Sequence, residues 1–229
     1  KINDYMFVKA SGQHLANASA INIFIKVYPR DYYYLQNNEL KLNTSQKLFL
    51  AKDNLKPSIE SHFHAILPKK VVLHSHSIDI IAHTMMNPFE KTARNTLYNI
   101  NWQYINYVQP GVELAKKVYE SMKPEHNIYI LQNHGLIVCG DTAEEAEYLQ
   151  NKVIKNLQLS RRKLAINKLD LLIDLVKYFP DLSLPASQII HTLATDAWSL
   201  ELANQNPYSP DHAVFCGIKP LVLTDINQD

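Results

Sequence analysis

The chain has 229 residues, of which 46% are hydrophobic and 20% charged, a composition typical of a globular protein that buries a large core. Its 23 basic and 22 acidic residues leave a formal net charge of +1, so we expect neither nucleic acid nor membrane as a partner. Its two cysteines, Cys139 and Cys216, lie in short apolar runs where a free cysteine acts as a small buried hydrophobe. We therefore expect a reducing, cytoplasmic location.

Strand-like and helix-like segments alternate along the chain. The expected strands are rich in Val, Ile, Phe and Tyr and lie at residues 5–9, 21–28, 71–74, 104–108, 128–131 and 136–139. The expected helices lie at residues 58–67, 77–86, from 88, at 111–122 and from 141 to beyond 162. Ser58 and Asp141 are the expected N-cap residues of two of them. The alternation indicates a mixed α/β domain with helices packed on a sheet, followed by a helical extension.

The ends of the sequence and its glycine content suggest absent segments. Only five of the 229 residues are glycine, against a usual share of ~7%. The sequence opens at Lys1 directly before an expected strand, and a strand-like run at 220–224 precedes a polar end. We expect a single domain over residues 1–229, with a core at about 5–165, a helical extension at about 166–229, and missing segments at one or both ends.

Two histidines stand two residues apart at the end of an apolar strand. His74 and His76 follow Val71, Val72 and Leu73. Residues two apart on a strand point to the same face, so both imidazoles can reach one metal ion. The alternative is an ordinary pair of polar side chains, since a lone His-x-His is weak evidence for a metal site.

A third histidine, His134, lies between two apolar strands in the turn formed with Asn133 and Gly135. It is either a third metal ligand or a histidine that caps the hairpin. Three histidines suit a catalytic zinc site, which keeps one position for water or substrate. Glu60, in the helix before the His-x-His strand, is a candidate fourth ligand or general base, and its alternative role is to interact with the helix dipole. His64, four residues later, either orients Glu60 or is structural.

As a set, these motifs resemble the class II aldolase/adducin family. The matching segments are Phe7 to Gly12, Pro57 to His64, Val71 to Ser77, Gln132 to Gly140 and Asp141 to Ala146. The resemblance is strongest to the rhamnulose-phosphate-aldolase-like branch, which also has Pro210-Asp-His212 after a helical insertion. It implies a class II aldolase/adducin-like α/β fold, with a central, mainly antiparallel sheet, helices packed on both sides and a helical C-terminal extension.

The resemblance also implies the roles of individual residues. His74, His76 and His134 would bind Zn²⁺ or another divalent transition metal, and Glu60 would be a ligand or acid/base group. The residues implied in substrate binding are Ser11, Gly12, Ser58 and Asn133. Two features depart from the family pattern: the glycine-rich phosphate loop is absent, and Ile59 stands where phosphate-using aldolases tend to have a second serine.

The activity implied is that of a metal-dependent aldolase, a lyase that cleaves a carbon–carbon bond of a sugar phosphate or sugar-acid-like substrate through a metal-stabilised enediolate. Tyr107 and Tyr208 are candidate proton donors, although a tyrosine is more often an amphipathic packing residue. Epimerases, dehydratases and decarboxylases use the same ligands, and the adducin-type alternative is a non-catalytic interaction module. The family's enzymes are typically homotetramers, so we expect a homo-oligomer.

Overall fold

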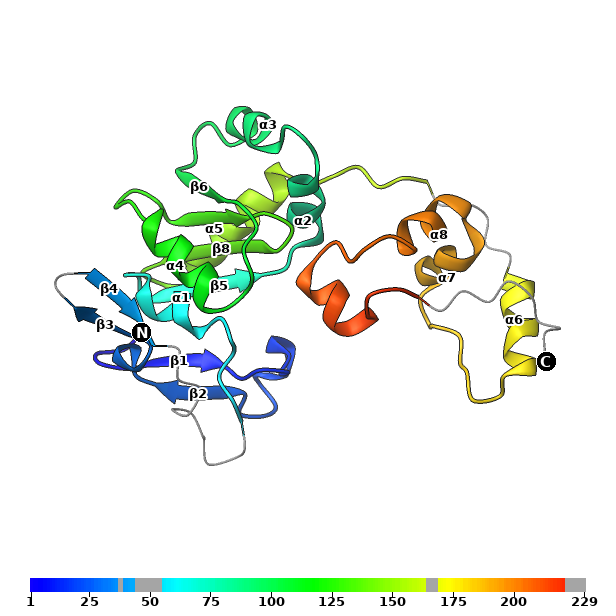
Figure 1. The fold of residues 1–229 in the computed structure, drawn as a ribbon, viewed down its shortest axis with the longest axis horizontal. Coiled ribbons are helices and arrows are strands. Elements are labelled where there is room, and N and C mark those ends of the chain that lie inside the picture. The colour runs from blue at the N-terminus through cyan, green and yellow to red at the C-terminus, as the bar shows by residue number, and fades with distance from the viewer. Residues whose placement is uncertain (37–38, 44–54, 164–168, 221–229) are drawn as a thin grey trace. The chain divides into compact units, whose positions relative to one another are not determined.

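The computed structural model of the chain describes residues 1–36, 39–43, 55–163 and 169–220. The chain divides into two compact units, residues 1–158 and residues 159–229 (Figure 1). The first unit contains every residue for which the sequence predicts a metal-binding role. None of the helices within the described ranges is long and apolar enough to cross a membrane.

A four-stranded sheet forms the centre of the first unit. Its strands follow the order β5 (Val71–Ser75), β8 (Gly135–Gly140), β7 (Ile128–Leu131) and β6 (Trp102–Ile105). β8 pairs antiparallel with both β5 and β7, whereas β6 pairs parallel with β7. The prediction of a mainly antiparallel central sheet is therefore confirmed. Every residue of β7 and β8 is buried, which explains why their sequences are continuous apolar runs instead of alternating patterns.

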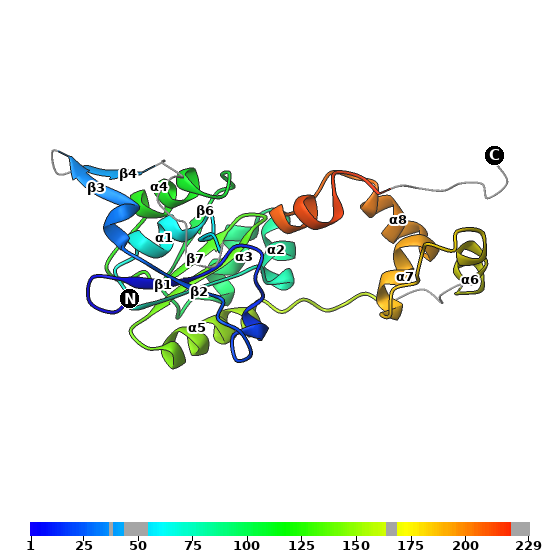
Figure 2. The ribbon, with the colours of Figure 1, turned by 90° about the horizontal axis from the view of Figure 1, so that it is seen from below.

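Helices cover both faces of this sheet (Figure 2). On one face, alternate residues of β7 and β8 pack against α1 (Ser61–Ile66) and α4 (Val112–Glu120). On the other face, the intervening residues pack with α2 (Ile78–Met85), α3 (Phe89–Thr96) and α5 (Ala143–Asn156). The first face comprises Tyr129, Leu131, Ile137 and Cys139, and the second comprises Ile128, Ile130, Leu136 and Val138. Full burial of each such aliphatic side chain contributes roughly 1.5–3 kcal/mol to stability.

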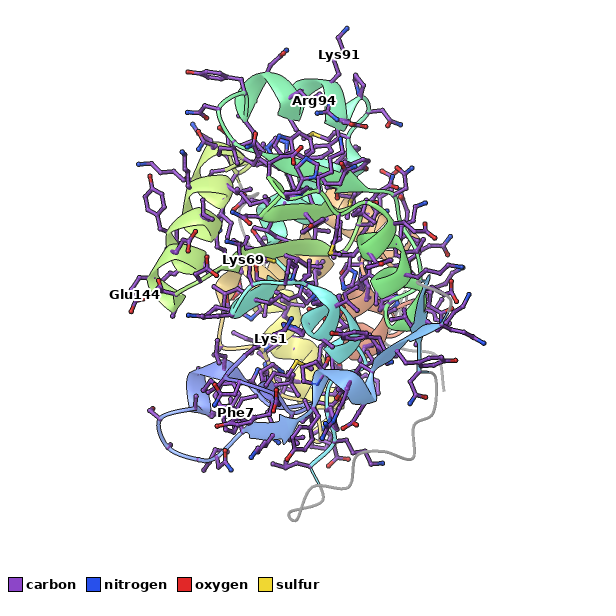
Figure 3. All side chains as sticks on the ribbon, turned by 90° about the vertical axis from the view of Figure 1, so that its left-hand side faces the viewer. Lys1, Phe7, Lys69, Lys91, Arg94 and Glu144 are labelled. Atoms are coloured by element: carbon purple, nitrogen blue, oxygen red, sulfur yellow. The ribbon has the colours of Figure 1, made fainter. Side chains whose placement is uncertain are left out.

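Two antiparallel hairpins precede the central sheet. β1 (Met6–Lys9) pairs with β2 (Phe24–Val27), and β3 (Tyr33–Gln36) pairs with β4 (Glu39–Leu42). The short 3₁₀ helices η1 (Leu15–Asn17) and η2 (Pro29–Asp31) lie between these strands. The side chain of Lys1, labelled in Figure 3, lies between the first hairpin and α1, and its Nζ donates to the carbonyl of Ala65 at 2.7 Å. The two strands of the first hairpin were predicted from the sequence, whereas their pairing and the second hairpin were not.

The second unit is helical within the residues that the structure describes, in agreement with the predicted C-terminal extension. It contains α6 (Leu169–Tyr178), α7 (Gln188–Thr195), α8 (Ala197–Ala203) and the π-helical turn η4 (His212–Cys216). Cys139 is buried in the first unit, as predicted, but Cys216 is exposed, so that expectation was wrong for the second cysteine. The reason is that η4 has no buried residues and leaves its apolar side chains uncovered.

The predicted start of α1 was wrong. The helix begins at Ser61 instead of Ser58, and Glu60 occupies the N-cap position. Ser58 instead forms a turn with the residues that follow it: its hydroxyl accepts from the Glu60 N–H at 3.2 Å, and its carbonyl accepts from the Ser61 N–H at 3.0 Å. The Ser58 side chain thus satisfies a backbone donor before the helix begins, and Glu60 is held at the helix entrance.

The predicted limits of two other elements also needed correction. The N-cap of α5 is Thr142, whose hydroxyl accepts from the Glu145 N–H at 3.1 Å, and not Asp141. α5 ends at Asn156 because the next residue, Leu157, leaves helical geometry and is buried in the core. β6 spans 102–105 instead of 104–108. Residues 164–165 of the expected core and 221–224 of the expected last strand lie outside the described residues.

Candidate metal centre

Strand β5 carries His74 of the His-x-His motif at the end of the central sheet, and His76 follows its last residue, Ser75. His74 pairs with Ile137 of β8, and its Nδ1 lies 3.0 Å from the Leu136 carbonyl oxygen. Because a carbonyl can only accept, Nδ1 of His74 carries the proton in this bond and Nε2 keeps its lone pair. That lone pair is directed towards His76, since the two Nε2 atoms are 2.8 Å apart. The two rings thus meet, as the spacing predicts, although His76 lies just beyond the end of the strand.

The turn between β7 and β8 places His134 beside this pair. His134 is 2% exposed, and its ring centroid lies 5.1 Å from that of His74 and 4.9 Å from that of His76. The turn requires unusual backbone geometry, with φ of 53° at Asn133 and 151° at Gly135. Gly135 also packs against β5, because a Cβ built on it would lie 2.3 Å from the Ser75 carbonyl oxygen.

The N-cap position of α1 brings the carboxylate of Glu60 into the same cluster. Glu60 Oε2 lies 3.2 Å from His74 Nε2, and Glu60 Oε1 lies 3.0 Å from His134 Nε2. One ligand atom from each of Glu60, His74, His76 and His134 lies within 4.8 Å of the other three. The structure thus brings the four predicted side chains together.

This donor set fits a divalent transition metal. Zinc prefers imidazole nitrogen and carboxylate oxygen at ~2.0–2.2 Å, and a tetrahedral ion with such bonds keeps its ligands ~3.3–3.5 Å apart. The observed nitrogen–oxygen and nitrogen–nitrogen separations of 2.8, 3.0 and 3.2 Å need only small adjustments to reach that geometry. The cluster can therefore hold one ion with three histidines and one carboxylate.

The electrostatics of the cluster favour a cation. Burial opposes ionisation of Glu60, but its interactions with the neighbouring imidazoles of His134 and His74 outweigh it and hold the pKa of the Glu60 carboxyl well below its usual range. Glu60 is therefore negatively charged at neutral pH. The neighbouring His64 adds no positive charge, because burial, reinforced by His74, lowers its pKa to about 3.

Three of the four residues predicted to bind substrate, Ser11, Gly12 and Ser58, come from two adjacent segments. Ala10 forms an antiparallel bridge with Pro57, and the Ser11 N–H donates to the Lys56 carbonyl at 2.8 Å. These contacts place the Ser11–Gly12 turn beside the segment that carries Ser58 and leads into Glu60. Asn133 lies next to His134, a candidate metal ligand, in the β7–β8 turn.

Tyr107 lies on an exposed loop between β6 and α4, with 52% of its surface exposed. Its backbone N–H donates to Gln132 Oε1 at 3.0 Å, and Gln132 immediately precedes the Asn-His-Gly turn. At the other end of the same loop, Gly111 approaches the side chain of Ile59, next to Glu60. Tyr208 lies in the second unit, where its hydroxyl donates to Gln205 Oε1 at 2.8 Å.

Sequence reasoning missed Gln132 and Thr84, whose side chains make hydrogen bonds at the turn that carries His134. Gln132 connects the turn to the Tyr107 loop, and the hydroxyl of Thr84 accepts from the Asn133 N–H at 2.9 Å. The only signal in the sequence was the position of Gln132 directly before the motif. Thr84 is distant in sequence and gave no such signal.

The comparisons with known proteins agree with this architecture. A model of the Class II Aldolase and Adducin N-terminal domain matches residues 2–158, almost the whole of the first compact unit. The chain belongs to this family. The N-terminal class II aldolase domain of a conserved protein from Thermoplasma acidophilum is 25% identical, with a TM-score of 0.53 over 67% of this chain and 73% of that chain. The predicted family and fold are therefore confirmed.

Two further similarities were found. An aldolase II superfamily protein from Pseudomonas syringae is 15% identical, with a TM-score of 0.43 over 84% of this chain and 71% of that chain. A protein of Bacillus subtilis named uncharacterized oxidoreductase YuxG is 28% identical over 147 residues, which are 62% of this chain and 21% of that protein. This chain thus spans about a fifth of the length of the curated relative that it matches.

Proposed function

We propose that this protein is a metal-dependent aldolase, a lyase that cleaves a carbon–carbon bond in a sugar phosphate or a sugar-acid-like substrate. The observation that carries the proposal is the convergence of Glu60, His74, His76 and His134, with one ligand atom of each within 4.8 Å of the others. A non-catalytic relative has no need of a complete ligand set around an ionised carboxylate. The family membership of residues 2–158 supports the same proposal.

The three histidines and Glu60 would hold Zn²⁺ or another divalent transition ion, because imidazole sites of this kind accept several first-row metals. The bound ion would supply Lewis-acid chemistry by stabilising the negative charge that an enediolate develops as the carbon–carbon bond breaks. His74 is oriented for ligation by its Nδ1 bond to the Leu136 carbonyl.

Glu60 is the group that we assign to proton transfer. Its carboxylate is ionised, because the interactions with the imidazoles of His134 and His74 lower its pKa more than burial raises it. An ionised carboxylate acts as a base, so Glu60 would take the proton from the substrate hydroxyl whose oxygen becomes the new carbonyl. Its position at the start of α1 leaves its side chain 12% exposed, so substrate can reach it.

The remaining predicted residues would bind and protonate the substrate. Ser58, Ser11 and Gly12 belong to adjacent segments that lead into Glu60, and their hydroxyl and backbone groups would bind the substrate's polar end. Asn133 would contact the substrate from the ligand turn. Once the aldehyde has left, Tyr107, on its exposed loop, would donate the proton that the remaining enediolate takes up at carbon.

Ile59 bears on the choice of substrate. Its side chain is 63% exposed and lies between Ser58 and Glu60, where a second hydroxyl would strengthen phosphate binding. An exposed apolar side chain offers no donor to a phosphate, so sugar acids without a phosphate belong in any substrate screen beside sugar phosphates. The Pro210-Asp-His212 pattern leads us to assign the chain to the rhamnulose-phosphate-aldolase-like branch, and the family membership leads us to expect a homotetramer.

The proposal is tested first by elemental analysis of gently purified protein, beside a His74→Ala/His76→Ala double variant. We expect about one equivalent of transition metal in the parent and its loss in the double variant, since three-histidine sites need their ligands together. His14→Ala is the matched control, because His14 is exposed and lies outside the cluster. A parent protein that stays metal-free after zinc is offered would refute the catalytic assignment and favour an adducin-like interaction module.

The second test is a screen of sugar phosphates and sugar acids with the zinc-, manganese- and cobalt-loaded protein. Aldehyde release that depends on metal and is absent in the double variant is the expected outcome. Metal-dependent loss of carbon dioxide or of water, or inversion of a stereocentre without cleavage, would instead assign a decarboxylase, dehydratase or epimerase.

A further inference from the structure

The metal-ligand histidines differ in what holds their rings. Nδ1 of His74 is fixed by the Leu136 carbonyl at 3.0 Å. Nδ1 of His134 is buried and has no hydrogen-bond partner within the residues that the structure describes. Metal-ligating histidines are ordinarily oriented through this second ring nitrogen. The orientation of His134 must therefore come from the backbone of the turn that carries it.

The side chain of Thr84 holds that turn. Thr84 lies in the last turn of α2 and is 3% exposed. Its hydroxyl donates to the Ile81 carbonyl at 2.8 Å, which directs the remaining lone pairs away from the helix. One of them accepts from the Asn133 N–H at 2.9 Å. The bond satisfies the backbone N–H of Asn133, whose φ is 53°. Residues other than glycine adopt this conformation infrequently, and the hydrogen bond stabilises it here.

α2 also begins immediately after the His-x-His motif. Ser77 is its N-cap, and the Ile81 N–H donates to the Ser77 carbonyl at 2.9 Å. The helix therefore connects two parts of the ligand set: its start follows His76 directly, and its end holds the neighbour of His134. A change at Thr84 is expected to alter the position of His134 relative to His76.

We propose that Thr84 is a positioning residue for the metal centre, whose hydroxyl fixes the Asn133–His134 turn so that His134 points at the ion. The inference rests on the proposed role of His134 as a metal ligand. It predicts that the hydroxyl, and not only the volume of the side chain, determines metal affinity.

The test compares Thr84→Val, which keeps the shape but removes the hydroxyl, with Thr84→Ser, which keeps the hydroxyl. Zn²⁺ affinity is measured by competition with a chromophoric chelator, and Co²⁺ absorption spectra report the coordination geometry. We expect Thr84→Val to bind Zn²⁺ about 10- to 100-fold more weakly, the usual effect of losing a group that orients a ligand. Thr84→Ser should bind within a few-fold of the parent.

Thr92→Val is the matched control, since the Thr92 hydroxyl also bonds to a carbonyl of its own helix but is exposed and belongs to α3. Its affinity should equal that of the parent. Should Thr84→Val fail to fold, Thr84→Ala compared with Thr84→Ser isolates the hydroxyl in the same way. Equal affinities in the valine and serine variants would overturn the assignment. A parent that binds no Zn²⁺ would refute the proposed function and this inference together, whereas a hydroxyl-independent affinity would refute only the inference.

Discussion

A methyl group at Gly135 would occupy space that the backbone of the His-x-His strand already fills. The Cβ of Gly135→Ala would lie 2.3 Å from the Ser75 carbonyl oxygen and 3.2 Å from the His76 Cα. Relieving that contact to 3.0 Å requires β5 and β8 to move apart by about 0.7 Å. Both neighbouring atoms belong to the backbone, so no side-chain rotation can remove the overlap.

The cost has two parts. Holding an alanine at the φ of 151° found at Gly135 costs roughly 1–3 kcal/mol, and forcing a methyl group into a packed site costs roughly another 1–3 kcal/mol. Together these predict a loss of about 2–6 kcal/mol, or a melting temperature lower by roughly 4–24 °C for a unit of this size. A shift of about 0.7 Å also exceeds the ~0.2 Å tolerance of metal–ligand distances, so zinc affinity should fall at least about tenfold.

Differential scanning calorimetry and zinc competition measure the two effects on the same preparations. Gly12→Ala is the control, because Gly12 also has a positive φ, of 73°, but has no atom within 4 Å of the added Cβ. Gly12→Ala should lose only the stability that an alanine at positive φ costs, and it should keep the zinc affinity of the parent. A Gly135→Ala protein with unchanged stability and unchanged zinc affinity would refute the reasoning that the close approach of β5 requires glycine at this position.

Three further predictions concern the site. Glu60→Gln should retain one equivalent of zinc through the three histidines but reduce kcat by roughly 10²–10⁴, and an unchanged kcat would exclude Glu60 as the base. Removing the metal with a chelator should lower the melting temperature by roughly 5–11 °C relative to protein with zinc at 100 times its Kd. A melting temperature that does not depend on the metal would refute zinc binding by the folded protein. Because the folded-state pKa of His64 is lowered to about 3, below the usual ~6.5 of an unfolded chain, its contribution to stability is present above pH 6.5 and is lost as pH falls towards 3. Between pH 4 and 6, His64→Gln should reduce the slope of the unfolding free energy against pH by about 1.4 kcal/mol per pH unit, as measured by denaturation at several pH values. The same slope in the variant and the parent would refute this role of His64.

Much of the first unit could be predicted because its information is local. The apolar runs of β7 and β8 follow from their burial on both faces. The two-residue spacing of His74 and His76 predicts that their rings meet, and they do so even though β5 ends between them at Ser75. The limits of elements were less predictable. Ser58 and Asp141 both have side chains suited to an N-cap, yet the helices begin later, where other contacts satisfy the backbone.

The sequence by itself determined which side chains are suited to bind a metal: His74 and His76 on one strand face, His134 in a glycine-containing turn, and Glu60 near a helix start. Only the tertiary structure decided that they meet. β8 pairs between β5 and β7, which places the His134 turn beside the His-x-His strand, and the late start of α1 directs Glu60 between His74 and His134. The contact between Thr84 and the Asn133 N–H likewise joins residues 49 positions apart. Such contacts depend on which elements become neighbours, and local residue patterns do not specify that.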